Sequence, residues 1–261
     1  MFQTVIIASG SKGNCVLIQT ENTALLLDAG ISMHRIMECL ESYHIESAKI
    51  NGILVSHEHS DHIKSVGAIS RKLKIPVYIN RPTLSSCAEH LGDVQDRIVL
   101  FNTGNSFTIG DIIIEPFVST HDAAESCNFV FYPVSEPKRK LGVATDLGYP
   151  TQLCLLKLSG VSTLILESNH DEKMLMEGPY DWKLKQRIRS LQGHLSNVQA
   201  VGLISALIHP GLKNLILAHL SEINNLPSLA EQTMQDYLNS IRSDIKLFVA
   251  EQNRPTPPIE I

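Results

Sequence analysis

The sequence predicts a mixed α/β fold in which two β-sheets pack face to face and helices cover both outer faces, a four-layer αββα sandwich. Two observations support this prediction. Strand-like and amphipathic helical segments alternate in both halves of the chain, and no stretch rich in Pro, Ser or Gly divides it. With 43% hydrophobic content, residues 1–261 are numerous enough to bury the core of one large domain.

The first third of the chain combines a β-meander with alternating helices and strands. Strands are expected at 4–8, 15–20, 24–28, 52–55 and 77–79. Gly, Ser and Asn mark the turns between the first three strands. Ser32 is the expected N-cap of a helix whose apolar residues share one face, and helical periodicity returns at 63–73 and 82–91.

The remaining elements are expected to complete the two sheets. A second, antiparallel set of strands is predicted at 98–101, 106–109, 112–115 and 129–132. Further strands are predicted at 142–146, 163–167, 215–218 and 246–250, and helices at 180–190, 196–208 and 228–242. The Pro-rich end, residues 252–261, is expected to form an extended tail.

Cysteine usage, hydropathy and charge restrict the setting. The five cysteines are scattered without a Cys-x-x-Cys pair, which indicates free buried thiols in a reducing compartment. No signal-peptide pattern and no window near ~18 uninterrupted apolar residues occurs, so we expect a cytoplasmic protein without a membrane partner. The formal net charge of −5 leaves nucleic acid open as a partner if metal ions or local Lys and Arg hold it. The oligomeric state is also left open.

Metal-ligating residue types are concentrated after the expected strand at 52–55. His57, His59, Asp61 and His62 lie within six residues. Imidazole and carboxylate are ligands that zinc, manganese and iron accept. His57 and His59 are expected to project to one side of an extended turn and chelate one ion, while Asp61 and His62 begin a helix and face a second ion. The segment therefore predicts a metal site.

The run His-Glu-His-Ser-Asp-His at 57–62 resembles the HxHxDH motif of the metallo-β-lactamase superfamily. The other family motifs occur in the expected order, so the resemblance extends from Ser9 to about Ala230. Asp28 resembles the aspartate that orients the histidine loop, and Asp146 resembles the carboxylate that bridges two metals.

The resemblance implies a dinuclear centre of the αββα metallo-β-lactamase fold. One ion would be held by His57, His59 and His121, the other by Asp61, His62 and His219, with Asp146 between them. Two divalent ions are implied, with zinc expected and manganese or iron as alternatives. A hydroxide shared between them would be the nucleophile.

Two further residues resemble the acid–base pair of tRNase Z and related phosphodiesterases. By this resemblance Glu167 orients His194, and His194 protonates the leaving alkoxide. Asp61, Glu167 and His194 are therefore the expected catalytic residues. The structural alternative is that Glu167 only ends a strand and His194 only precedes the helix at Ser196.

Four segments make the YycJ/WalJ group the most similar family: residues 8–14, 167–171, 193–197 and 219–225. That family is associated with exonuclease-like cleavage of DNA from 5′ ends. Ser11, Lys12 and Asn14 are the expected substrate-binding residues, because a Gly-rich turn with a lysine can receive a terminal phosphate. A plain hairpin turn is an equal alternative, and Lys12 departs from the SGSSGN pattern of other members.

Basic residues near the predicted site can track phosphates. Lys183, Lys185, Arg187 and Arg189 lie in one helical segment, and residues 138–140 form a second cluster. An ordinary solvated helix face and a charged hairpin tip are the alternatives. With 5% aromatic residues, an extensive base-stacking platform is not expected.

The sequence thus favours a metal-dependent phosphodiesterase, and specifically a DNA exonuclease. Two rivals remain: a hydrolase of a small phosphodiester or thioester, and a non-catalytic metal-binding regulatory protein. The complete ligand set argues against the second rival. A diiron redox role is weaker, because the chain has no room for a flavin-bearing domain.

Overall fold

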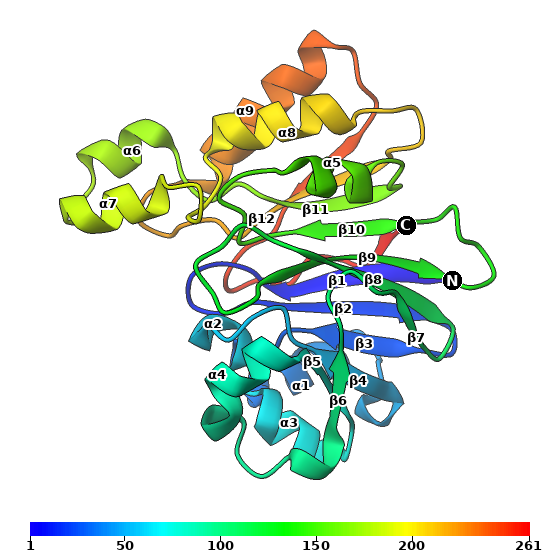
Figure 1. The fold of residues 1–261 in the computed structure, drawn as a ribbon. Coiled ribbons are helices and arrows are strands. Elements are labelled where there is room, and N and C mark those ends of the chain that lie inside the picture. The colour runs from blue at the N-terminus through cyan, green and yellow to red at the C-terminus, as the bar shows by residue number, and fades with distance from the viewer.

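Two seven-stranded sheets pack face to face in the computed structural model, which describes residues 1–261, and helices cover both outer faces (Figure 1). The first sheet consists, in spatial order, of β14 (Ile259–Glu260), β1 (Phe2–Ala8), β2 (Cys15–Thr20), β3 (Ala24–Leu27), β4 (Ile50–Leu54), β5 (Val77–Asn80) and β6 (Ile98–Phe101). The second consists of β13 (Lys246–Val249), β12 (Asn214–Ala218), β11 (Thr163–Glu167), β10 (Leu141–Ala144), β9 (Cys127–Pro133), β8 (Ile112–Val118) and β7 (Phe107–Ile109). The predicted αββα sandwich is confirmed.

The helices divide between the two sheets. On the first sheet lie α1 (Met33–Ser42), α2 (Ser60–Ile63), α3 (Val66–Leu73) and α4 (Arg81–Leu91). On the second lie α5 (Gln152–Leu158), α8 (Asn197–Leu207) and α9 (Pro227–Ser240). The short pair α6 (Glu172–Glu177) and α7 (Trp182–Ile188) stands away from the layers at one end of the sheets (Figure 1).

Three apolar clusters fill the three interfaces between the four layers. Strand β3 shows how a short sequence serves two of them. Leu25 and Leu27 point into the cluster between the sheets, whereas Ala24 and Leu26 point toward α1 and α3. Because successive side chains of a strand alternate between faces, a central strand buried on both sides reads as a continuous apolar run.

The structure corrects two predictions about strands. The sequence pattern places Ile98–Phe101 in the second, antiparallel set, but β6 pairs in parallel with β5 in the first sheet, because α4 carries the chain back over that sheet. The C-terminal tail is extended as predicted, yet it is also part of the first sheet. Thr4 of β1 pairs with Ile259 of β14, and the Ile259 and Ile261 side chains are buried between the sheets.

The carboxyl ends of parallel strands from both sheets meet at one edge of the sandwich. Asp28 follows β3, Asp146 follows β10, Glu167 ends β11 and His219 follows β12. Asp28, Asp146 and His219 have φ values of 60°, 53° and 54°, in the left-handed region that non-glycine residues rarely adopt. Such strain gathers at functional sites, where the surrounding structure over-determines it. This edge is therefore where a site is expected.

Candidate metal centre

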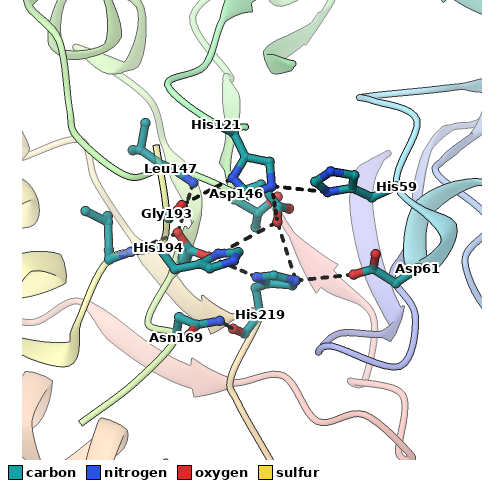
Figure 2. Close-up of polar contacts among 12 residues, drawn as sticks. His59, Asp61, His121, Asp146, Leu147, Asn169, Gly193, His194 and His219 are labelled. Carbon is teal, nitrogen blue, oxygen red and sulfur yellow. Dashed lines mark hydrogen bonds and ion pairs between the residues drawn. The ribbon is translucent and has the colours of Figure 1, made fainter. Parts of the chain in front are cut away.

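Two groups of candidate ligands converge at this edge (Figure 2). Each group offers ligand atoms that lie within 4.8 Å of one another. The two groups are His57, His59 and His121, and Asp61, His62 and His219. Figure 2 shows His59 and His121 on one side, Asp61 and His219 on the other, and Asp146 behind them.

Asp146 lies between the two groups. Its Oδ2 is 3.3 Å from Nε2 of His62, and its Oδ1 is 3.7 Å from Nε2 of His121 and 3.5 Å from Nε2 of His219. A carboxylate in this position can contact an ion in either group. The fold thus brings together all seven residues that the sequence proposes as ligands, from segments as far apart as 57 and 219.

Contacts at Nδ1 fix the orientation of four histidine rings. Nδ1 of His62 lies 2.7 Å from Asp28, that of His57 lies 3.0 Å from Oγ of Ser56, and that of His121 lies 3.2 Å from the Gly193 carbonyl. His219 is held in the same way by a carboxylate described below. A partner at one ring nitrogen leaves the other, Nε2, facing the centre, which is how histidine ligands are oriented.

Three polar atoms at the centre have no hydrogen-bond partner although they are buried. They are Nε2 of His57, Nε2 of His219 and Oδ2 of Asp146. Buried polar atoms in native proteins are almost always satisfied, so a converging set of unpartnered ones requires an explanation. Nitrogen and carboxylate oxygen are donors that zinc, manganese and iron bind, and these residues fit a pair of divalent ions.

The charge of the centre also fits cations. Burial by itself lowers the pKa of His219, but the carboxylates of Asp146, Asp61 and Glu167 around it raise it to about 10. The pKa of His62 is raised despite burial, because Asp146, Asp28 and Asp61 surround it. Carboxylates that hold neighbouring imidazoles protonated create a demand for positive charge, which metal ions would meet in place of the protons.

Glu167 connects His194 with His219. Its Oε1 is 2.7 Å from Nδ1 of His194 and 2.9 Å from Nδ1 of His219, and its Oε2 accepts hydrogen bonds from the backbone N–H groups of Leu147 and Leu195. Another cluster with atoms within 4.8 Å of one another is thereby explained without a metal, and it consists of Asp146, Glu167, His194 and His219. Both oxygens of Glu167 are already occupied, so it orients histidines. The sequence does not predict the contact with His219.

His194 faces a cavity of about 230 Å³ that also contains His59, Asp61, Asp146 and His219. Residues of α7 and the loop around it, among them Tyr180 and Arg187, line the other side. With Nδ1 held by Glu167, Nε2 of His194 is the atom left to face a bound molecule.

The Gly-rich turn at 10–14 lies next to the centre, but its residues differ in orientation. Ser11 and Lys12 are exposed, and Ser11 lines the cavity. Asn14 is buried, and its Nδ2 lies 3.3 Å from Asp61 and 3.1 Å from Nε2 of His62. The sequence predicts that Asn14 binds substrate, whereas the structure turns its side chain toward the histidine loop.

The basic clusters are less available than the sequence suggests. Lys185 is buried and donates to the carbonyls of Met176 and Gly178, while Arg187 pairs with Asp122. Residues 138–140 precede β10, whereas Asp146 follows it, so they lie on the order of 15–20 Å from the centre. This separation favours the alternative for residues 138–140, a charged hairpin tip away from the site.

Two supporting residues have no role that the sequence alone predicts. Oγ of Ser9 accepts a hydrogen bond from the backbone N–H of His219 at 2.7 Å, and Nδ2 of Asn169 donates to the carbonyl of His219 at 2.9 Å. Both lie in segments that resemble the family, but only the structure shows that they hold the strained backbone of His219 from both sides.

Comparison with known proteins agrees with this geometry. Residues 23–220 match the model of the β-lactamase superfamily domain. Exodeoxyribonuclease YycJ of Bacillus anthracis is 38% identical over 234 residues, 89% of this chain and 88% of that protein. Exodeoxyribonuclease WalJ of Streptococcus pneumoniae is 34% identical over 267 residues, covering 100% of this chain and 98% of that protein. The chain belongs to the β-lactamase superfamily, within the YycJ/WalJ family.

Solved structures agree on the fold of this β-lactamase superfamily member. The metallo-β-lactamase fold protein YhfI of Bacillus subtilis superimposes with a TM-score of 0.74 at 16% identity, covering 98% of both chains. Human tRNase Z, short form, superimposes with a TM-score of 0.64 at 16% identity, covering 99% of this chain and 100% of that one.

Among the helices, none has the length and apolar content that a membrane crossing requires.

Proposed function

We propose that the protein is a dinuclear metal-dependent exodeoxyribonuclease that hydrolyses phosphodiester bonds of DNA from 5′ ends. The observation that carries the proposal is the Glu167–His194 pair, which lies beside the seven candidate ligands and leaves Nε2 of His194 facing the cavity. The resemblance to two named exodeoxyribonucleases over nearly the whole chain supports DNA as the substrate.

The residues of the chain divide the work as follows. His57, His59 and His121 would hold one divalent ion, Asp61, His62 and His219 the other, and Asp146 both. When bound, such ions supply an activated water and neutralise charge on the phosphate. Glu167 keeps the His194 ring in place through the contact at Nδ1, and Nε2 of His194 delivers a proton to the leaving sugar oxygen. An alkoxide is a poor leaving group, so this proton is needed.

Metal content tests the first part of the proposal. Elemental analysis of the purified protein should give about two ions per chain, because six terminal ligands and one shared carboxylate are available. Zinc is expected, with manganese or iron as alternatives that the same ligands accept. A protein reconstituted with these metals that carries none near His57 and Asp146 would remove the basis of the proposal.

Substrate choice tests the second part. Duplex and single-stranded DNA, each labelled at one end and prepared with or without a 5′ phosphate, should be shortened from the 5′ end, and RNA of the same sequence more slowly. A cyclic nucleotide and a thioester represent the rival small-molecule hydrolases. If the protein turns over the cyclic nucleotide or the thioester faster than DNA, it is a small-molecule hydrolase. If it turns over none of these substrates, a regulatory protein is favoured.

The cytoplasm is the proposed location. All five cysteines are buried and unpaired, as expected in a reducing compartment. Localisation of the tagged protein in cell fractions tests this.

A further inference from the structure

A second cavity borders the catalytic one. It has a volume of about 630 Å³ and shares Ser11 and Asp61 with the catalytic cavity of about 230 Å³. We name it the side groove. Its other lining residues are Lys12, Gly30, Ser60, Ile63, Lys64 and His90. One wall therefore comes from the turn after β1, and the other comes from α2, the residue after it and the end of α4.

Three of the exposed side chains of the side groove are basic. Lys12, Lys64 and His90 are all exposed, and only Lys12 has a carboxylate partner, Glu222. Asp61 is the one acidic residue in the lining, and it is also a candidate metal ligand. A polyanion that leaves the catalytic cavity in this direction meets Lys64 and His90, which have no carboxylate partner to give up.

The walls are fixed before any ligand binds. The backbone N–H of Lys12 donates to Oε1 of Gln252, and the backbone N–H of Asn14 donates to the carbonyl of Asp61, both at 2.8 Å. A Cβ atom on Gly30 would lie 1.5 Å from that same carbonyl, so the two walls touch through bare backbone. A preformed groove costs a ligand little reorganisation.

Two basic side chains of α7, on the other side of the catalytic cavity, already have partners. Arg187 is paired with Asp122 there, and the ammonium group of Lys185 is buried against backbone carbonyls. The side groove, by contrast, presents Lys64 and His90 without a carboxylate partner.

We propose that the side groove binds the phosphates of the substrate strand next to the scissile bond. The inference rests on the phosphodiesterase function proposed above and specifies how that site favours a polymer. The catalytic cavity is the smaller of the two and receives the reacting end, while Lys12, Lys64 and His90 contact the following phosphates. Binding should be independent of base sequence, because phosphate contacts carry no sequence information.

The test uses the Lys64→Ala/His90→Ala double variant of the metal-loaded enzyme, with Lys213→Ala as the matched control. Lys213 is exposed in a cavity at the opposite end of β12. The double variant should raise KM for DNA about tenfold or more and leave turnover of bis-p-nitrophenyl phosphate within about twofold, because only the polymer reaches the groove. The ratio of the KM of the double variant to the KM of wild type should grow with oligonucleotide length and then level off.

Binding provides a readout that does not require cleavage. In the His194→Ala background, fluorescence anisotropy of a labelled oligonucleotide should show that the slope of log K against log salt falls by about 0.7–0.9 for each phosphate that the variant no longer neutralises. Equal slopes and equal KM values for the double variant and Lys213→Ala would overturn the proposal. If wild type cleaves no DNA, the proposed function fails, and the salt slope alone then decides whether the groove binds phosphates.

Discussion

The two sheets each contribute a buried carboxylate that orients histidines, but the two carboxylates have different tasks. Asp28, from the first sheet, accepts from Nδ1 of His62 and from both the N–H and the hydroxyl of Ser56. Glu167, from the second sheet, engages His219 and also His194. Asp28 therefore serves only the histidine loop, whereas Glu167 couples a candidate ligand to a candidate acid.

This difference suggests that the halves of the site are specialised. The first sheet supplies most of the ligands from one continuous segment, residues 57–62, and the second supplies isolated residues at the ends of separate strands. The continuous segment 57–62 places several ligands close together, which suits tight binding of ions. In the second sheet, the carboxylate of Glu167 reaches the rings of both His194 and His219, so proton transfer can be coupled to the metal centre.

The largest expected effect is that of Asp146→Ala, which removes the residue that joins the two halves. It should lower metal content at both positions and reduce turnover by more than about 10⁴-fold. His62→Ala should mainly affect one position, because His62 belongs to only one of the two ligand groups. Metal stoichiometry after dialysis distinguishes the two variants. Equal loss of a single ion in both would show that Asp146 does not bridge.

His194→Ala should leave metal content unchanged and reduce turnover of DNA by about 10²- to 10⁴-fold, the usual contribution of a general acid. The loss should be smaller for bis-p-nitrophenyl phosphate, because nitrophenolate departs without protonation. Steady-state rates on both substrates measure the contrast. A ligand role for His194 would appear instead as a lost ion, and a binding role as equal losses on both substrates.

The same comparison explains what can be predicted from the sequence. Residues 57–62 carry four ligands in one motif, so the first half of the site is recognisable locally. His121, Asp146 and His219 are identified only through resemblance, since a lone histidine or aspartate after a strand has many structural roles. The alternation of strand-like and helical segments indicates the layers, but no local signal places β6 in the first sheet.

The remaining features depend on tertiary contacts that a sequence pattern does not encode. The second contact of Glu167, the inward turn of Asn14 and the burial of Lys185 each require knowledge of which segments lie side by side. A lysine side chain is normally exposed to solvent, so the residue type alone predicts that Lys185 is exposed. Its burial is favourable only because its ammonium group donates to the carbonyls of Met176 and Gly178 at the end of α6.

Asp28→Asn and Glu167→Gln form the direct test of the specialised halves. Each should weaken metal binding by about 10- to 100-fold, the usual effect of removing a group that orients a histidine ligand. With saturating metal, Glu167→Gln should still lose more activity on DNA than on bis-p-nitrophenyl phosphate, whereas Asp28→Asn should lose equally on both. The same leaving-group dependence in the two variants would show that the carboxylates have equivalent roles.

The smallest expected effect is that of Ser9→Ala. The Ser9 hydroxyl contacts both His219, which follows a strand of the second sheet, and Asn14, which lies beside the histidine loop. Its Oγ accepts from the backbone N–H of His219, and it lies 3.5 Å from Oδ1 of Asn14 beside the histidine loop. Ser9→Ala leaves that buried N–H without a partner and should lower the free energy of unfolding by about 1–3 kcal/mol.

Turnover of Ser9→Ala should fall by less than about tenfold, because the ligands themselves remain. Ser205 is the matched control, since its hydroxyl lies on the exposed side of α8 and donates only to the carbonyl of Gly202. Denaturant unfolding of both variants with and without metal measures the effect. If the two halves are coupled through Ser9, metal should stabilise Ser9→Ala less than it stabilises Ser205→Ala. Equal stabilisation would mean that the ions bind independently of this contact between the two sheets.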